Sequence, residues 1–317
     1  MAESGTVTFT DPDGYAAAFG DTRITLTVTG SGDFEARLTR LKLHHLEVRC
    51  CCESLPRIAY ISLPAEWIFI SFPLGAASLI SNGAALRSGD IVLHSRGERM
   101  HQRSAAACQW GLISLSPEEL ARCGKALTGR PIASPRASRI LRPSRSEALR
   151  FRRLFTHACR LAENRHRLVE RPEVARALEQ ETLHAIINCL TVNDASDNPR
   201  ARRRHAAVMV RFEEIIGQRI GDKINIPALC AEVGIPERTL RLCCTEFLGV
   251  SPTRYLLLRR LNRVRWALRR ADPATTSVTE IARNYQFQEL GRFAGTYRTT
   301  FGELPSATLR RGLQTSA

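Results

Sequence analysis

The sequence has no long unbroken run of apolar residues, whereas a helix that crosses a membrane needs about 20 of them. Residues 1–15 also lack the basic stretch and following apolar run that mark a secretory signal. These absences predict a cytoplasmic protein with no membrane partner.

A disulfide framework is missing too, although the sequence contains ten cysteines. Cys50, Cys51 and Cys52 are adjacent, Cys243 lies beside Cys244, and the others are scattered. Reduced thiols in a cytosolic protein are the simpler interpretation of this pattern. Neighbouring residues of a strand point to opposite faces, so the adjacent cysteines are poorly suited to holding one metal ion. Whether they have a redox role stays open.

The ligand set of a metal enzyme is also absent. His94 and His101 could be ligands on a β-barrel scaffold, but the sequence does not contain the tight His-x-His pair with a downstream glutamate. His44 and His45 are expected to alternate across a strand, one inward and one outward. We therefore expect no metal, no cofactor and no catalytic residue, and a protein that is not an enzyme.

Acidic residues are outnumbered, and the excess of basic residues is uneven. The 317 residues carry a formal net charge of +15, which calls for a polyanionic partner. From Arg200 to the C-terminus there are 21 Lys and Arg against 10 Asp and Glu, so about +11 of this charge lies in the last third. A chain of this length has room for two domains, and the C-terminal one is the candidate for binding nucleic acid.

Residues 1–125 are rich in short β-type segments bounded by glycine, proline or serine. The segments are Ile24–Gly30, Leu41–Val48, Arg57–Pro64, Trp67–Pro73 and Gly111–Pro117. Regular short strands broken by turns predict a β-sandwich or a small β-barrel for this domain.

Residues 126–200 have a helical pattern and are interpreted as a connector. One helical face collects Val174, Leu178, Thr182, Ile186 and Leu190. The polar segment 191–204 contains a proline and ends in basic residues, so it is interpreted as the interdomain linker. The predicted fold class is thus α+β and multidomain, with an all-α domain at 201–317.

That last domain contains an internal repeat, because Ala228–Pro252 resembles Glu280–Pro305. Each copy predicts a short helix, a turn and a longer helix with one apolar stripe. Each ends with a glycine and, three residues later, a proline, as expected where a helix stops. Past the turn, residues of the two copies correspond at an offset of 53, so Leu240 corresponds to Phe293.

A short helix, a turn and a second helix form a helix-turn-helix unit, whose second helix can enter a major groove of DNA. The polar face of that helix then faces the bases, where arginine suits guanine, glutamine suits adenine and glutamate suits cytosine. The predicted DNA-binding residues are Glu237, Arg238, Thr239, Arg241, Thr245, Gln288, Glu289, Leu290, Gly291, Arg292, Gly295, Thr296 and Arg298. Arg254 and Arg298 are expected to bind phosphates, which hold register without selecting sequence.

Between the copies, Thr253–Ala271 predicts one long helix. Leu257, Leu261, Val264 and Leu268 should face inward, while Arg259 and its neighbours Arg260, Arg263, Arg269 and Arg270 should lie largely outside. Such a helix spans roughly 28 Å. This is comparable to the ~34 Å helical repeat of DNA, so two recognition helices could enter successive major grooves.

This arrangement resembles the DNA-binding domain of the AraC/XylS transcription regulators over residues 203–313. The resemblance rests on Ile281–Ala282, Phe287, Phe293, Phe301–Gly302, Pro305, Leu240, Gly249, Ser251–Pro252 and Arg260–Leu261. The chain departs from the family pattern at Gln286, Pro236, Leu242 and Gly291, where Gly, Ser, Arg and Ser are usual.

The resemblance implies a cupin-like N-terminal barrel that binds a small-molecule effector or forms a homodimer. Residues 89–101 loosely match the second cupin motif. It also implies an activator that recruits RNA polymerase to a double-stranded DNA operator, with repression left open.

Two other functions compete with a sequence-specific regulator. One is an enzyme with an attached DNA-binding module, either a metal-dependent cupin or a cysteine-based DNA-repair protein. The other is a nucleoid protein that binds DNA without sequence preference.

Overall fold

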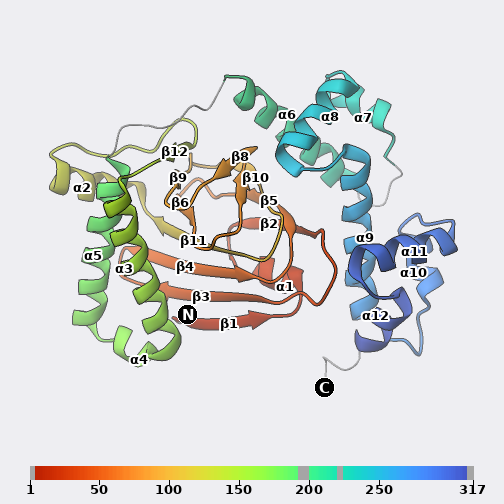
Figure 1. Ribbon diagram of the computed structural model, residues 1–317, viewed down its shortest axis with the longest axis horizontal. Helices are drawn as coiled ribbons and strands as arrows, with labels where there is room; N and C mark the ends of the chain where they lie inside the picture. Colours follow the sequence, from red (N-terminus) through yellow and green to blue (C-terminus); the bar gives the residue numbers. More distant parts are fainter. Residues whose placement is uncertain (1–3, 192–199, 220–223, 313–317) are drawn as a thin grey trace.

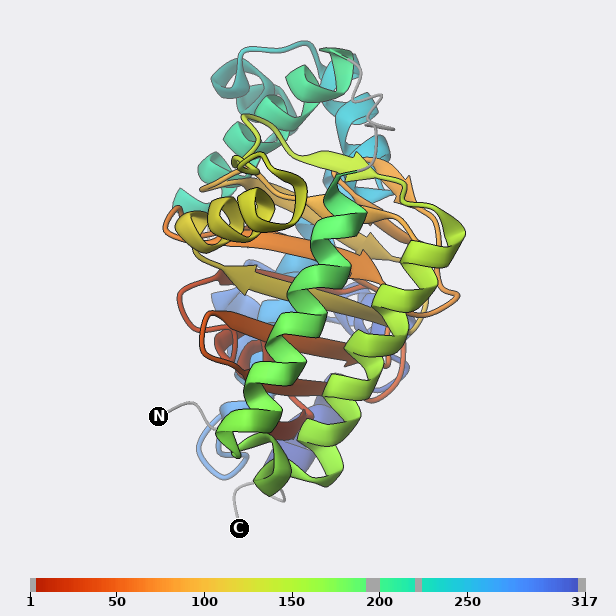
Figure 2. The ribbon, with the colours of Figure 1, turned by 90° about the vertical axis from the view of Figure 1, so that its left-hand side faces the viewer.

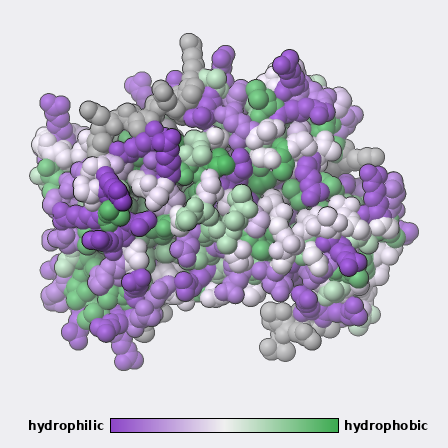
Figure 3. All heavy atoms as spheres, viewed as in Figure 1, coloured by the Kyte–Doolittle hydropathy of each residue, from purple (hydrophilic) through white to green (hydrophobic). Residues whose placement is uncertain are grey.

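The computed structural model describes residues 4–191, 200–219 and 224–312 (Figure 1). A β-rich N-terminal part lies beside a helical C-terminal part, and the long helix α9 (Pro252–Arg270) runs along the boundary between them. Hydrophilic side chains cover the helices at both ends of this view, and paler residues gather between them (Figure 3).

The described residues form two antiparallel sheets. The seven-stranded sheet has the order β1-β3-β4-β11-β6-β9-β12 and the five-stranded sheet has the order β2-β5-β10-β7-β8. The strands are β1 (Gly5–Phe9), β2 (Arg23–Val28), β3 (Ala36–Lys42), β4 (Leu46–Glu53), β5 (Arg57–Ser62), β6 (Ile68–Pro73), β7 (Leu79–Ser81), β8 (Ala84–Leu86), β9 (Ile91–Leu93), β10 (Arg99–Ser104), β11 (Cys108–Leu115) and β12 (Arg139–Leu141). Helix α1 (Pro12–Ala17) lies between β1 and β2.

The two sheets share one core. Leu38 and Leu112 from the larger sheet and Leu26 and Ile61 from the smaller one belong to the same buried cluster. Several strands contribute alternate residues to it, as Ala36 and Leu38 of β3 do. The prediction of a β domain built from short strands is therefore confirmed.

The adjacent cysteines follow the same alternation. Cys51 is fully buried in this shared core, whereas Cys50 packs against the cluster on the opposite face of the sheet. All ten cysteines of the chain are free.

The predicted strand Leu41–Val48 is wrong. Its ends belong to β3 and β4, and between them the amide of Leu43 donates to the carbonyl of Leu46 in a tight turn. His44 and His45 lie in this turn and are both exposed, so they do not alternate across a strand. Leu43 and Leu46 are buried on either side of the turn, which gave the sequence the appearance of one continuous strand.

Helices cover the outer face of the larger sheet (Figure 2). They are α3 (Arg145–Asn164) and α5 (Pro172–Leu190), joined through α4 (His166–Val169) and accompanied by α2 (Pro117–Thr128). Phe151 and Phe155 of α3 pack against Phe72 of β6 with ring centroids 4.8 Å apart. Thr182, Ile186 and Leu190 are buried, as the helical pattern of this segment predicted.

Helices also make up the whole described C-terminal part. They are α6 (Arg200–Gln218), α7 (Ile226–Val233), α8 (Glu237–Leu248), α9, α10 (Val278–Asn284), α11 (Leu290–Phe301) and α12 (Pro305–Gly312). Of the predicted linker, residues 192–199 lie outside the described residues, and residues 200–204 form the first turn of α6 instead. No helix among the described residues has the length and apolar character needed to cross a membrane.

Helix α9 joins two separate cores. Its first half packs with α6, α7 and α8 around Phe212, Leu240 and Phe247, and its second half packs with α10, α11 and α12 around Phe293 and Phe301. Figure 1 shows α7 and α8 near one end of α9 and α10 to α12 beside the other. The predicted connecting helix is therefore confirmed.

The prediction that Arg259 lies outside is wrong. Its side chain is only 12% exposed and forms an ion pair with the buried Glu213 of α6. Glu213 also accepts hydrogen bonds from the hydroxyl of Tyr255, at 2.6 Å, and lies 2.9 Å from Nε2 of His101 in β10. The sequence pattern of α9 could not show this, because the carboxylate and the histidine come from other elements.

Further contacts hold α9 against the smaller sheet. The side chain of Asn262 accepts a hydrogen bond from the amide of Val28 and donates one to its carbonyl, each at 3.0 Å. A guanidinium nitrogen of Arg265 donates to the carbonyl of Gly32 and to Glu303. Helix α9 thus connects the N-terminal sheets to both helical cores.

Candidate nucleic-acid interface

The first helix pair, α7 and α8, is joined by a turn that glycine permits. Gly234 has φ = 80°, a left-handed conformation that a side chain disfavours. The amides of Gly234 and Ile235 both donate to the carbonyl of Cys230, which closes the end of α7. Pro236 precedes α8 and provides no side-chain cap, and α8 ends at Gly249, where φ = 72°.

The second helix pair, α10 and α11, repeats this geometry with different residues. The amide of Phe287 donates to the carbonyl of Ala282, five residues back, as Ile235 does to Cys230. Gln286 occupies the left-handed position with φ = 64° although it is not glycine. Helix α11 ends at Gly302, where φ = 78°. The internal repeat predicted from sequence is therefore present in the backbone.

Helix α8 turns its polar residues away from the core. Arg238, Arg241 and Thr245 are exposed, and Glu237 and Thr239 are partly exposed. Nε of Arg241 donates to Glu237 across one helical turn at 2.9 Å. The hydroxyl of Thr245 donates to the carbonyl of Arg241. Arg238, Arg241 and Thr245 are thus accessible on the side of α8 that faces away from its core.

Helix α11 presents a similar surface with two glycines in it. The side chains of Glu289 and Arg292 are 77% and 82% exposed and lie 3.9 Å apart. Gly291, Gly295, Thr296 and Arg298 of α11 are also exposed or partly exposed, as is Gln288, which precedes the helix. Leu290 differs from them, because its side chain packs partly against the core of this helix pair.

One exposed residue on α8 was not among the predicted contacts. Leu242 is 57% exposed and lies between Arg238 and Thr245 along the outward face. The signal in the sequence was its position, since Leu240 and Cys243 to Cys244 fill the inward stripe and leave Leu242 outside it.

The histidines considered as metal ligands have other partners. Nε2 of His94 lies 2.8 Å from the hydroxyl of Ser71 and its Nδ1 lies 2.8 Å from Glu98, while His101 contacts Glu213. Within residues 4–191, 200–219 and 224–312, no three or more His, Cys, Asp or Glu are placed to hold a metal ion.

Neither Cys50 nor Cys51 nor Cys108 is poised as a nucleophile. The hydrogen bond with Cys159, together with burial, raises the pKa of Cys50 to about 12. Burial raises the pKa of Cys51 above its ordinary value and that of Cys108 to about 12. A thiol with a raised pKa is protonated at neutral pH, and the thiolate is the nucleophile.

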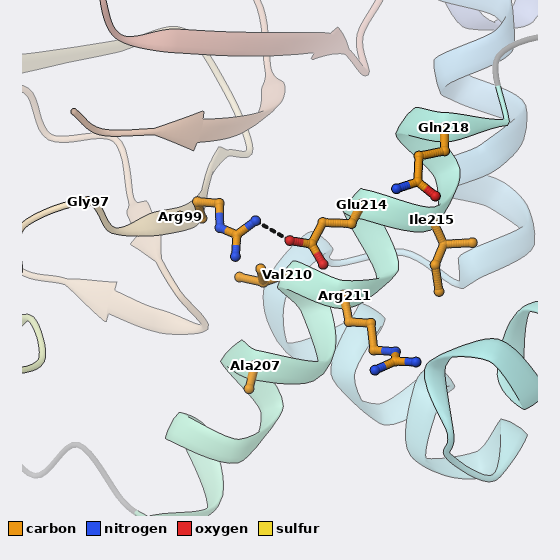
Figure 4. A pocket seen from close by; sticks show the side chains of 8 residues that line it. All are labelled: Gly97, Arg99, Ala207, Val210, Arg211, Glu214, Ile215 and Gln218. Atoms are coloured by element: carbon orange, nitrogen blue, oxygen red, sulfur yellow. Dashed lines mark hydrogen bonds and ion pairs between the residues drawn. The ribbon is translucent and has the colours of Figure 1, made fainter. Parts of the chain in front are cut away.

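Among the cavities of the described residues, two lie outside the helix pairs. One of about 650 Å³ lies between the β9–β10 loop and α6, and an ion pair of Arg99 with Glu214 crosses its edge (Figure 4). The other, of about 530 Å³, is in the N-terminal part and is lined in part by Arg37, Cys52 and Glu53.

Comparisons with known proteins address the C-terminal region. A family model described as a helix-turn-helix domain matches residues 229–311. A probable thc operon regulatory protein of Rhodococcus erythropolis is 41% identical over 87 residues, which are 27% of this chain and 26% of that one. A XylDLEGF operon transcriptional activator of Pseudomonas putida is 36% identical over 101 residues, 32% of each chain. Residues 229–311 thus match a helix-turn-helix family model, and the chain is similar to these operon regulators over about a third of its length or less.

The matched region spans only about a quarter to a third of these relatives' length. Among solved structures, the AraC-like transcriptional activator CuxR aligns with a TM-score of 0.43 and 13% identity, over 81% of this chain and 94% of that chain. A probable AraC family transcriptional regulator from Rhodopseudomonas palustris aligns with a TM-score of 0.31 and 35% identity, over 33% of this chain and 96% of that one.

Proposed function

We propose that this protein is a sequence-specific DNA-binding transcription regulator. Its helix pairs α7–α8 and α10–α11 act as two helix-turn-helix units, with α8 and α11 as the recognition helices. The observation that carries this proposal is that both helix pairs have the same turn geometry and are connected by one continuous helix, α9. The second helix of each pair, α8 or α11, also has a polar, accessible face.

The length of α9 supports binding to successive grooves. Its 19 residues span roughly 28 Å, which is close to one helical repeat of DNA. The organisation that accompanies this function is a cupin-like domain at 1–125, a connector at 126–200 and the DNA-binding domain at 201–317.

The N-terminal domain is proposed to control the C-terminal one. The buried contacts of Glu213 with His101 and of Asn262 with Val28 give it a direct route to α6 and α9. A small-molecule effector or a second copy of the chain could act through that route. The similar protein of Pseudomonas putida is named as an operon transcriptional activator, which favours activation, and we propose that activation recruits RNA polymerase.

An enzyme is the weaker alternative. A metal-dependent cupin needs convergent ligands, whereas His94 and His101 are bonded to separate groups. A cysteine-based repair protein needs an activated thiol, whereas the pKa values of Cys50, Cys51 and Cys108 are raised.

Selection of preferred duplexes from a random library, at fixed salt, tests the proposal. Arg292→Ala should cost about 1–3 kcal/mol of binding free energy and relax the preference at one base pair. Arg298→Ala is the matched control and should weaken binding to all sequences alike. If the wild-type protein selects no duplex over random DNA, it is a nonspecific binder, and the proposed function is wrong.

A further inference from the structure

Leu242 is the most exposed large hydrophobic residue of the described chain, at 57%. A single exposed leucine is ordinary on a protein surface, so its exposure alone means little. Its position carries more weight. It lies four residues after Arg238 and three before Thr245, so it stands in the row of side chains that α8 turns away from its core.

The neighbours of Leu242 limit what its surface can do. Arg241 is paired with Glu237 on one side of the row. On the other side, Glu246 lies 2.6 Å from Nδ1 of His205 and also pairs with Arg202, both from α6. The apolar side chain therefore stands between two paired polar groups, where it cannot be covered by its own helix.

We propose that Leu242 contacts the C5-methyl group of a thymine in the major groove, so that it selects thymine at one base pair of the site bound by α8. This inference rests on the proposed function, because it requires α8 to enter the groove. Thymine is the base that offers an apolar group on the major-groove edge, and leucine has no donor or acceptor for the other bases.

The second helix pair provides an internal contrast. The offset of 53 between the copies places Gly295 of α11 at the position of Leu242. Gly295 is exposed, and a Cβ built on it would meet no atom within 4 Å. The half of the site bound by α11 should therefore show no methyl dependence of this kind.

Replacement of thymine by deoxyuridine tests the inference, because deoxyuridine keeps the base pair and loses only the methyl group. After selection of a preferred duplex, each thymine is replaced singly and Kd is measured at fixed salt. Wild-type protein should bind about fourfold more weakly at one position in the α8 half, the effect of burying one methyl group. Leu242→Ala should bind both duplexes equally at that position.

Leu304→Ala is the matched control, because Leu304 is also exposed, at 46%, and lies outside both recognition helices. It should keep the full difference between thymine and deoxyuridine. If the Kd of the wild-type protein is unchanged by deoxyuridine at every position, the inference is wrong. The proposed function would still hold, because a preferred duplex was selected. If no duplex is selected, both the proposed function and the inference about Leu242 are wrong.

A third result also counts against the inference. If Leu242→Ala leaves Kd and the deoxyuridine pattern unchanged but reduces transcription in a reporter, Leu242 contacts a protein and not a base.

Discussion

The first helix pair packs around Leu240, Cys244 and Phe247, whereas the second packs around a row of rings. In the second pair, centroids of Phe293 and Tyr297 are 5.7 Å apart and those of Tyr297 and Phe301 are 4.8 Å apart. Both pairs nevertheless have the same backbone turn and end at a left-handed glycine. The shared geometry therefore depends on the turn and on the helix ends, and the core can be filled in more than one way.

The two pairs also differ in how they contact the N-terminal sheets. The core of the first pair is held through the neighbouring helix α6, whose buried Glu213 meets His101. The second is held through the main chain, since the amide of Gly32 donates to the carbonyl of Phe301 at 3.2 Å. Arg265 reinforces that contact by donating to the carbonyl of Gly32.

The largest expected effect comes from Glu213→Ala, which leaves Arg259 buried without its partner. We expect the free energy of unfolding to fall by about 3–5 kcal/mol. Glu214→Ala is the control, because its ion pair with Arg99 is exposed and should contribute about 1 kcal/mol or less. Urea denaturation measures both, and equal losses would contradict a special role for the buried group.

The same carboxylate predicts a pH dependence. Burial alone would raise the pKa of Glu213, but Arg259 and His101 hold it below its ordinary value of 4.5. Its contribution is therefore complete above about pH 4.5 and is lost as the pH falls below that value through the folded pKa. The stability difference between wild type and Glu213→Gln should shrink on acidification, and a difference that grows would contradict the assignment.

Phe301→Ala should loosen the second pair with little effect on the first. Loss of a buried ring costs about 3–5 kcal/mol, and the two cores are separate clusters. Hydrogen exchange should quicken in α10 to α12 after Phe301→Ala, and in α7 and α8 after the corresponding Leu248→Ala. If either substitution speeds exchange in both pairs equally, the cores are one cooperative unit.

Substitutions in the two turns should change the stability of the protein in opposite directions. Gln286→Gly removes a side chain from a left-handed position and should stabilise the protein by about 1 kcal/mol. Gly234→Ala should destabilise it by about 1–2 kcal/mol through the backbone alone, because no atom lies within 4 Å of the added Cβ. Thermal unfolding of the two variants checks the signs, and two changes of the same sign would contradict the equivalence of the turns.

The smallest effects concern the helix caps. The hydroxyl of Ser277 accepts a hydrogen bond from the amide of Glu280 at 3.1 Å, so Ser277→Ala should cost about 1 kcal/mol. Pro236→Ser would give α8 the same kind of cap. The free energy of unfolding should rise by less than about 1 kcal/mol, because serine does not restrict the conformations of the unfolded chain as proline does. Loss of stability in Pro236→Ser would mean that the proline contributes more than a cap.

The local features of the C-terminal domain could be predicted from the sequence because glycine, proline and the helical stripe act over a few residues. The buried pairing of Arg259 could not, since Glu213 and His101 approach it only in the folded chain. The turn at His44 and His45 was hidden because leucines on both sides of it are buried. The exposure of Leu242 could have been inferred from the stripe of α8, but its surroundings depend on Glu246 and α6.

Strand β2 lies at the edge of the smaller sheet, and the side chain of Asn262 occupies both the amide and the carbonyl of Val28 there. The side-chain amide of Asn262 thereby makes the two hydrogen bonds that a neighbouring strand would make. Any movement that lifts α9 away leaves the N–H and the carbonyl of Val28 without their partner and opens a strand edge to other chains. Separation of the two parts is thus coupled to a tendency of the N-terminal part to pair with a new strand, and water or a second molecule must replace what Asn262 supplies.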